Sequence, residues 1–241
     1  MGNPFFRFKR FTVRQEGAAM KVGTDGVLIG AWAHIRPEDN RCLDIGTGTG
    51  LIALMLAQRT EGTDTVIDAV EIDKGSYLQA SENTAASEWG GRINLFNLPV
   101  QDFTVATDNK YDHIVANPPY FVDSLLPFGE ARSTARHTGS LTYADLLSCV
   151  SQLIAPDGIF TVIIPADGEE GFTKTAAESG LNVLRKCIVF TVAGTAPKRV
   201  MLELSRILGR VEAVDLAIEA GDGGGYTAEY MELTRDFYMK F

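Results

Sequence analysis

The sequence predicts an α/β fold, a doubly wound and mostly parallel sheet whose last core strand runs antiparallel. From residue 41 onward, short β-rich runs alternate with helical runs, which is typical of parallel strands joined by helices. The first β run ends in a glycine-rich turn that opens a helix. The last two β runs follow each other with no helix between them, which favours an antiparallel pair.

Hydrophobic periodicity assigns the elements one by one. Leu51–Arg59 is apolar nearly all round, as a buried helix would be, whereas Leu141–Ile154 is amphipathic. Pro156-Asp157-Gly158 is expected to turn the chain before the fifth strand. The expected strands are Arg41–Ile45, Thr65–Ile72, Ile93–Val100, Tyr111–Ala116, Ile159–Ile164, Val183–Val192 and Val200–Leu208, and the expected helices are Leu51–Arg59, Ser76–Glu88, Leu141–Ile154 and Gly171–Ser179.

The whole chain, 1–241, is expected to form one domain with a catalytic core at 39–208. An N-terminal extension, 1–38, should form a hairpin from the alternating segment Phe8–Gln15 through Glu16-Gly17 to Met20–Val22, and then a short helix from Thr24-Asp25. A C-terminal extension, 209–241, should add a strand over Val211–Ile218 and a helix from Thr227.

Composition limits the classes of protein that this chain can represent. Its 241 residues are 45% hydrophobic and carry a net charge of −9, which excludes wholesale disorder and a uniformly basic nucleic-acid binder. Three scattered cysteines give no disulfide framework, and no set of side chains has metal-ligand spacing. Apolar stretches are too short to cross a membrane. We therefore expect a cytoplasmic protein with no metal and no membrane contact; the sequence leaves the oligomeric state open and is compatible with a monomer.

The glycine-rich run Asp44-Ile45-Gly46-Thr47-Gly48-Thr49-Gly50 predicts a ligand site at the start of the first core helix. Ordinary strand-to-helix turns also use glycine, so this loop alone does not distinguish a ligand site from a structural turn. The spacing departs from the dinucleotide fingerprint, because Leu51 stands where the third glycine would be. Glu71 ends the second strand, where a carboxylate accepts hydrogen bonds from a ribose diol, and Asp102 is expected at the end of the third strand to accept from an adenine amine. A nucleoside cofactor without a pyrophosphate, such as S-adenosylmethionine, fits this pattern.

Asn117-Pro118-Pro119-Tyr120 follows the fourth strand and is expected to face the same crevice. The Asn117 side chain and the Pro118 carbonyl can both accept hydrogen bonds from an exocyclic NH₂ group and orient its lone pair toward a methyl donor. Tyr120 offers a ring for stacking a base removed from its helix or loop. A strand stopped by two prolines is the alternative interpretation.

These two motifs resemble the first and fourth motifs of class I S-adenosylmethionine-dependent N-methyltransferases. The segment Met20–Trp32 and the tail Tyr226–Tyr238 are similar to the bacterial tRNA1(Val) adenine-37 N6-methyltransferase family, so the resemblance covers nearly the whole chain. It implies a seven-stranded Rossmann-like methyltransferase sheet and methyl transfer from S-adenosylmethionine to N6 of adenine 37 in the anticodon loop of a tRNA.

The resemblance also assigns residues to roles. It implies target-amine binding by Asn117, Pro118 and Tyr120, and it places the Thr24-Asp25 helix start near the methionine end of the cofactor, where helix-terminal amides can meet a carboxylate. The residues expected to bind the cofactor are Thr24, Asp25, Asp44, Gly46, Gly48, Gly50, Glu71 and Asp102.

Basic residues near the N-terminus predict where RNA binds on an acidic protein. Residues 1–24 carry a local charge of +4, which leaves −13 for the rest of the chain. Phenylalanines interleave with Arg7, Lys9 and Arg10, as in surfaces that combine phosphate contacts with stacking. The alternative is that these phenylalanines pack on the core while the charges are solvated. A second expected RNA contact lies after the NPPY motif, at Arg132, Arg136 and His137.

Two other functions remain open from the sequence. The same N-methyltransferase chemistry could act on rRNA, on DNA or on a protein glutamine, although the roughly forty residues before the glycine loop leave little room for the N-terminal domain expected of the glutamine enzymes. A non-catalytic protein that binds S-adenosylmethionine or RNA is the third reading. Intact Asn117 and Tyr120 argue against it.

Overall fold

The computed structural model describes residues 3–118, 141–221 and 223–241. It places eight strands in one sheet, in the order β10-β8-β9-β7-β6-β3-β4-β5. β9 runs antiparallel to both of its neighbours, and the other pairs are parallel. The strands are β3 (Arg41–Ile45), β4 (Val66–Val70), β5 (Ile93–Phe96), β6 (Tyr111–Ala116), β7 (Ile154–Pro165), β8 (Asn182–Val192), β9 (Arg199–Ser205) and β10 (Glu212–Glu219).

The predicted fold class is therefore correct, and the C-terminal extension enlarges the sheet. The seven core strands expected from the sequence are all present, and β10 adds an eighth by pairing in parallel with β8. Glu219 at the end of β10 also bridges to Tyr226, which leads the chain back toward α8. The extension is thus built onto the core sheet.

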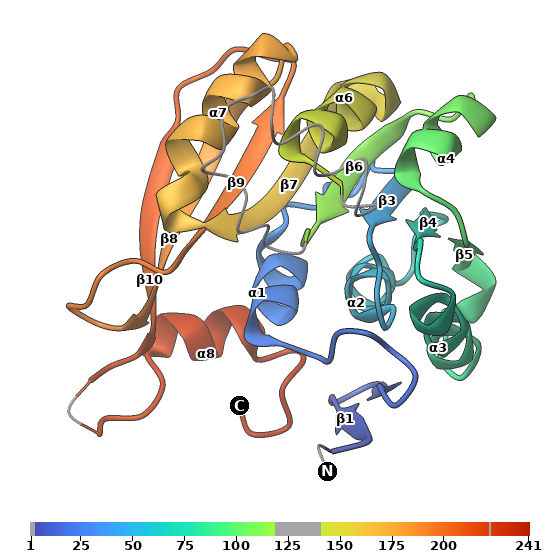
Figure 1. Ribbon diagram of the computed structural model, residues 1–241. Helices are drawn as coiled ribbons and strands as arrows, with labels where there is room; N and C mark the ends of the chain where they lie inside the picture. The colour runs from blue at the N-terminus through green and yellow to red at the C-terminus, as the bar shows by residue number, and fades with distance from the viewer. Residues whose placement is uncertain (1–2, 119–140, 222) are drawn as a thin grey trace.

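Helices cover both faces of the sheet (Figure 1). One buried cluster joins the sheet to α1, α2 and α8, and a second joins it to α4, α6 and α7. The helices are α1 (Thr24–Trp32), α2 (Leu51–Arg59), α3 (Lys74–Ala85), α4 (Val100–Ala106), α6 (Tyr143–Leu153), α7 (Glu169–Glu178) and α8 (Ala228–Thr234), with single 3-10 turns η1 (Gly90–Arg92) and η3 (Ala166–Gly168). No helix in the described ranges has the length and apolar character needed to cross a membrane.

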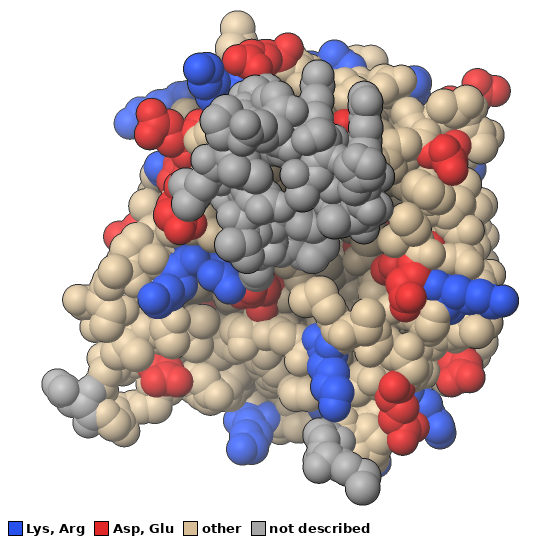
Figure 2. Space-filling view, viewed as in Figure 1, with Lys and Arg blue, Asp and Glu red and all other residues tan. Residues whose placement is uncertain are grey.

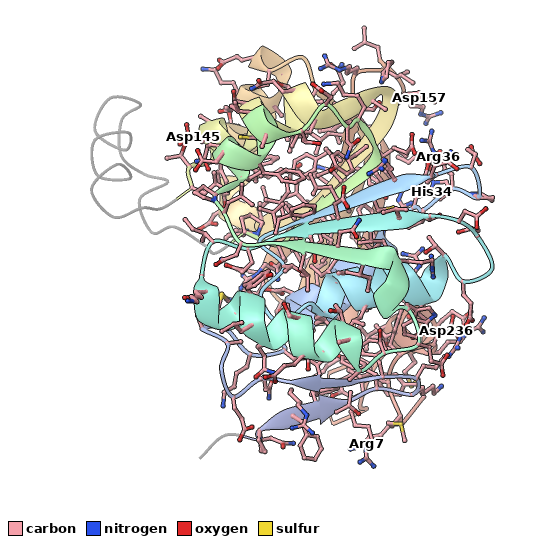
Figure 3. All side chains as sticks on the ribbon, turned by 90° about the vertical axis from the view of Figure 1, so that its right-hand side faces the viewer. Arg7, His34, Arg36, Asp145, Asp157 and Asp236 are labelled. Carbon is pink, nitrogen blue, oxygen red and sulfur yellow. The ribbon has the colours of Figure 1, made fainter. Side chains whose placement is uncertain are left out.

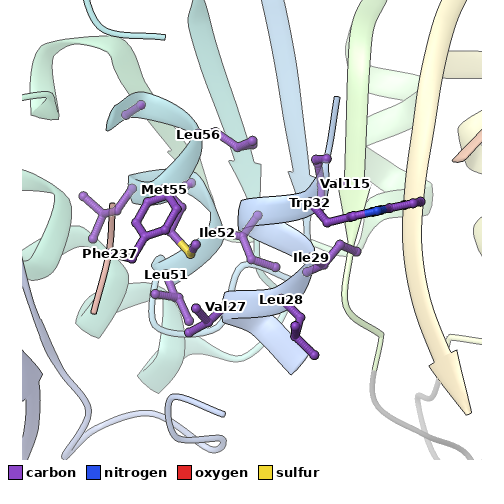
Figure 4. Close-up of a cluster of buried hydrophobic side chains, with 14 of the residues drawn as sticks. Val27, Leu28, Ile29, Trp32, Leu51, Ile52, Met55, Leu56, Val115 and Phe237 are labelled. Atoms are coloured by element: carbon purple, nitrogen blue, oxygen red, sulfur yellow. The ribbon is translucent and has the colours of Figure 1, made fainter. Parts of the chain in front are cut away.

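Helices α1 and α2 pack closely against each other (Figure 4). A Cβ atom at Gly30 would lie 2.7 Å from the Met55 sulfur, so a larger residue there would require the Met55 side chain to move. Val27, Leu28 and Ile29 are fully buried in this contact. Burial of apolar side chains of this size contributes roughly 1.5–3 kcal/mol each, which holds the start of α1 against the glycine loop.

The N-terminal extension forms a hairpin, but from other residues than expected. β1 (Phe5–Arg7) pairs with β2 (Thr12–Arg14), and the chain turns at 8–11 and not at Glu16-Gly17. Phe8 and Phe11 are both buried and stack with ring centroids 4.7 Å apart, so both face the core and break the alternation on which the prediction relied. Residues 20–22 form no strand.

The third core strand is shorter than predicted. β5 ends at Phe96, and Pro99 precedes the first residue of α4. Pro99 lacks an N–H for a strand pair, and its fixed φ suits a helix start. Leu98 and Val100 continued the apolar pattern because they line a cavity at the sheet edge, which a period-based prediction cannot separate from a strand.

Candidate active site

A cavity of about 640 Å³ opens at the carboxyl ends of the central strands β3, β4 and β6. Parallel strands with helices on both faces leave a crevice at this edge, where the strand order reverses around β3. Four short segments that follow strands, together with the N-terminal segment before α1, surround it. The lining includes residues 19–26, 45–49, 70–73, 98–101 and 116–118, with Leu51, Ile52, Ser76, Leu141 and Leu146.

The glycine loop forms the floor of the cavity. Gly46 and Gly48 have φ angles of +73° and +56°, in the left-handed region, and a Cβ atom added to either would meet nothing within 4 Å. Both residues line the cavity, so their backbones can approach a ligand directly. Gly50, also left-handed, lies outside the lining, and its Cβ position is 3.3 Å from Ala80 of α3. It serves helix packing where the sequence predicted cofactor contact.

Glu71 directly follows β4 and is held by two backbone amides. Its Oε2 accepts from Gly48 N–H and its Oε1 from Asp73 N–H, each at 2.8 Å. The carboxylate is 8% exposed and lines the cavity. Each oxygen retains lone-pair capacity, so the side chain can also accept from the two hydroxyls of a ribose. The predicted position of this acceptor is consistent with the geometry.

Asp44 lies beneath the glycine loop and outside the cavity lining. Its Oδ2 accepts from the Thr47 hydroxyl and from Ala53 N–H, so the carboxylate ties the loop to the first turn of α2. Its Oδ1 is buried and has no partner among the described residues. Burial raises the pKa of Asp44 to about 7, against the opposing effect of its two hydrogen bonds.

Asn117 and Pro118 leave β6 and line the cavity opposite the glycine loop. Asn117 lies beside α1, because its Nδ2 is 3.8 Å from the position that a Cβ atom would take on Gly26. Its side chain forms no hydrogen bond with any other described residue, which leaves the amide available to a ligand. Tyr120, the third residue predicted to act on the target, lies outside the described residues.

Thr24 and Asp25 line the cavity from the first turn of α1. Asp25 accepts from Arg199 Nε at 3.0 Å, which connects the start of α1 to the start of β9. Gly23, which precedes the helix, provides no side-chain cap for its amides. The predicted place of this helix start at the site is thus consistent with the fold.

Residues 15–22, which we name the strap, cross the cavity on their way to α1 and were missed as part of the site. Side chains of α3 bind the strap: Gly17 N–H donates to Gln79 Oε1 at 3.0 Å, and Ala19 N–H donates to Ser76 Oγ at 3.2 Å. Gln15 is buried and accepts from Val22 N–H at 2.9 Å. Ser76, Gln79 and Asn83 lie about one helical turn apart on α3 and are each buried, so this face of α3 binds the strap and the end of β2 before it.

The structure places Asp102 differently from the sequence prediction. Asp102 stands in the first turn of α4, is exposed and does not line the cavity, whereas its neighbour Gln101 does. The displacement follows from the shortened strand β5, since the chain is already helical at this position. Ile72 was missed: it is 59% exposed, follows Glu71 and offers the cavity an apolar side chain.

The basic residues of the N-terminal hairpin do not surround the cavity. Arg10 pairs with Glu61 and Glu88 and lies 5.0 Å from the Trp89 ring centroid, while the Lys9 ammonium donates to the carbonyls of Arg235 and Phe241. Figure 3 shows Arg7 and Asp236 at the opposite end of the molecule from Asp145, which lies in the first turn of α6 next to the cavity-lining Leu146. Arg132, Arg136 and His137 lie outside the described residues.

Comparisons with known proteins agree with this geometry. The Methyltransferase small domain family model matches residues 26–127. Proteins called tRNA1(Val) (adenine(37)-N6)-methyltransferase are 46% identical in Bacteroides fragilis, over 100% of both chains, 43% identical in Trichodesmium erythraeum, also over 100% of both, and 43% identical in Aeromonas salmonicida, over 99% of this chain and 98% of the other. Among solved structures, a predicted O-methyltransferase from Agrobacterium tumefaciens has a TM-score of 0.66 at 15% identity and covers 88% of this chain and 96% of its own, which shows a shared fold.

The described residues fit S-adenosylmethionine, whose sulfonium carries a transferable methyl group. Gly46 and Gly48 leave open space over their backbones, Glu71 presents a fixed diol acceptor, and a buried oxygen of Asp44 lacks a partner below the loop. Within the parts of the chain that the structure describes, no group of His, Cys, Asp and Glu could hold a metal ion. With full-length identities above 40%, the chain belongs to the tRNA1(Val) (adenine(37)-N6)-methyltransferase family of S-adenosylmethionine-dependent enzymes.

Proposed function

We propose that this protein transfers a methyl group from S-adenosylmethionine to N6 of adenine 37 in the anticodon loop of tRNA1(Val), in the cytoplasm. The observation that carries the proposal is the position of Asn117-Pro118 in the same cavity as the glycine loop. Full-length relatives named for this activity supply the choice of nucleotide and tRNA. We further propose that the chain acts as one catalytic domain, with the core at 39–208 and extensions at 1–38 and 209–241.

Asn117 and Pro118 would bind the target amine. The lone pair of an adenine N6 amine is delocalised into the ring, so the amine is a weak nucleophile. The Asn117 side-chain oxygen and the Pro118 carbonyl would accept hydrogen bonds from its two N–H groups and orient the nitrogen toward the methyl group. A strong general base is unnecessary, because the methylated nitrogen is cationic and releases its proton readily. We assign Tyr120 to stacking on the extruded base, worth roughly 1–3 kcal/mol.

Thr24, Asp25, Asp44, Gly46, Gly48, Gly50, Glu71 and Asp102 were the cofactor residues expected from the sequence. The cavity geometry supports direct contact for Thr24, Asp25, Gly46, Gly48 and Glu71. We assign Asp44 and Gly50 to shaping the loop, and Gln101 replaces Asp102 as the polar side chain at the start of α4 that can reach an adenine edge.

An Asn117→Ala variant tests this mechanism. We expect methylation of tRNA1(Val) transcript to fall by about 10²–10³-fold, as for removal of a preorganised transition-state contact, while the affinity for S-adenosylhomocysteine stays within threefold. Asn182→Ala, at the start of β8, is the matched control. A transcript with guanine at position 37 should not be methylated. Unimpaired turnover in Asn117→Ala would refute the role of Asn117, and activity on rRNA, DNA or a protein glutamine in place of tRNA would refute the substrate.

A further inference from the structure

We propose that the tRNA backbone crosses the mouth of the cavity between Lys21 and Lys198, and that these two lysines bind its phosphates in place of the N-terminal hairpin. The inference rests on the proposed function, because it concerns how the same site receives its RNA. The proposed RNA-binding surface thus lies around Asn117, and not on the basic N-terminal hairpin that the sequence indicated.

Two of the hairpin cations, Lys9 and Arg10, are already bound by other groups of the protein, and Arg7 lies far from the Asp145 end of the molecule (Figure 3). Arg10 is shared between two glutamates, and Lys9 is held by main-chain carbonyls near the C-terminus. Both border a separate hollow with Gln58, Arg59 and Asp236, at the far end of α2. Because α2 begins at the glycine loop and rises about 1.5 Å per residue over its nine residues, that hollow is roughly 13 Å from the cavity floor.

Lys21 and Lys198 approach the target-amine residues from different elements. Lys21 belongs to the strap and lines the cavity three residues before α1. Lys198 precedes Arg199, whose guanidinium binds Asp25 in the first turn of α1. That turn lies beside Asn117, since Gly26 faces its side chain. Lys21 therefore lies at the cavity itself, and Lys198 lies next to a residue that is hydrogen-bonded to the cavity-lining Asp25.

Both ammonium groups are available to a ligand. Lys21 and Lys198 are exposed, and neither side chain forms a hydrogen bond or an ion pair with a residue that the structure describes. A bound phosphate would therefore gain a cation without breaking an internal contact. Exposed pairs of this kind are weak in isolation, so the effect of each is measured best through the salt dependence of binding.

The charges inside the cavity explain why the backbone stays at its mouth. Asp25, Glu71 and Asp73 line the cavity, and Lys21 is the only cation among the described lining residues. A phosphodiester moved inward would meet these carboxylates, whereas a neutral adenine would not. Figure 2 shows basic side chains on this face standing apart among acidic ones, without a continuous basic surface. Contact through a few individual lysines suits a single extruded base on an otherwise acidic protein.

The test measures binding of tRNA1(Val) transcript to Lys21→Met, Lys198→Met and the double variant across 50–250 mM salt. Lys74→Met is the matched control, because Lys74 is exposed beside Asp73 at the start of α3 but does not line the cavity. Arg7→Gln tests the hairpin. We expect Lys21→Met and Lys198→Met each to reduce the magnitude of the slope of log association constant against log salt concentration by about 0.7, the value for a single-stranded phosphate contact. Each should also weaken binding about three- to tenfold. Lys74→Met and Arg7→Gln should match the wild type.

A second measurement separates RNA binding from cofactor binding. S-adenosylhomocysteine affinity should stay within twofold in every variant; a tenfold loss in Lys21→Met would assign Lys21 to the cofactor and overturn its role here. Unchanged slopes in both lysine variants, or an equal loss in Arg7→Gln, would overturn the proposed surface. If the wild type methylates a different RNA, the proposed function fails by itself, and the same series with that RNA still tests the lysines.

Discussion

Gly48 N–H donates to Glu71 Oε2 at 2.8 Å, so the acid at the end of β4 is fastened to the glycine loop after β3. Asp73 N–H donates to the other carboxylate oxygen at the same distance. One side chain thus sets the distance between the loop and the segment that follows β4. Neighbouring parallel strands bring these residues together although they are 23 positions apart in the sequence.

Replacing Glu71 by glutamine should damage the cofactor site more than the fold. Glutamine keeps one acceptor but turns an NH₂ group toward a backbone N–H, so one of the two hydrogen bonds is lost and a ribose hydroxyl loses its partner. We expect the affinity for S-adenosylmethionine to fall at least tenfold, and the free energy of unfolding to fall by about 1–2 kcal/mol. Calorimetric titration and urea unfolding measure the two effects. Glu178→Gln, at an exposed position on α7, should change neither; an unaltered affinity in Glu71→Gln would contradict the assignment.

Asn83 should govern the order of the chain at Arg14, the residue directly before the strap. It is 3% exposed, accepts from Arg14 N–H at 2.9 Å, and donates to the carbonyls of Arg14 and Thr49 at 2.8 and 2.9 Å. Asn83→Leu leaves these backbone groups unpaired in a buried place, which should cost about 2–4 kcal/mol of unfolding free energy. Hydrogen exchange at the Arg14 amide should accelerate, and cofactor affinity should drop because the strap and the loop both loosen.

The control for this prediction is Asn182→Leu, since Asn182 makes only a 3.4 Å contact through its side chain to Arg206. An Asn83→Leu protein with wild-type protection at Arg14 would show that this part of the chain is held by its other contacts.

The order of the core elements could be predicted because it depends on short-range periodicity. Leu51–Arg59 and Tyr111–Ala116 have the predicted bounds, since a buried helix and a buried strand each leave a clear apolar pattern. The pattern failed where buried or half-buried apolar residues of a loop, a turn or a helix start continue the apolar pattern of a strand. Leu98 and Val100 line the cavity on either side of Pro99. Phe8 and Phe11 are buried in one hydrophobic cluster, although both belong to the turn between β1 and β2.

The candidate site could be predicted only where a motif fixes the chemistry. The glycine loop, Glu71 and Asn117 do meet at one cavity. The strap could not be predicted, because its backbone is bound by side chains of α3 that are distant in sequence, and nothing local marks such a segment. Charge clustering in the sequence predicted an RNA surface at the hairpin, which the fold places away from the cavity. Arg10 is basic in the sequence, but its partners Glu61 and Glu88 are brought to it by the fold.

His113 should make the fold less stable in acid. It is fully buried in β6 and shares a 2.7 Å hydrogen bond with Thr161, and burial lowers its pKa, with Asp39 acting in the opposite direction. The unfolded chain binds a proton below about pH 6.5 that the folded chain resists, so this residue should lower the unfolding free energy as pH falls through that value, by up to about 1.4 kcal/mol per pH unit. The difference in stability between His113→Gln and the wild type, measured by urea unfolding from pH 7.5 to 5, should shrink in acid. A difference that does not vary with pH would contradict this.

Asp44 should have the opposite pH dependence, which the histidine conceals in the wild type. Burial raises the pKa of Asp44 to about 7, far above its unfolded value near 3.9, so the folded chain keeps a proton that the unfolded chain releases. Stability from this group is complete below about pH 4 and is lost as pH rises to about 7. Between pH 5 and 6.5 the two slopes oppose each other. Asp44→Asn should therefore expose a stability that rises with pH, and His113→Gln one that falls. Asp64→Asn, at an exposed position, should keep the nearly flat wild-type profile.

Because a bound methyl donor carries positive charge near the loop, its affinity for the wild type should also rise from pH 6 to 8 as Asp44 ionises, and Asp44→Asn should abolish that rise. Parallel pH profiles of affinity in the two proteins would show that Asp44 does not ionise in the complex.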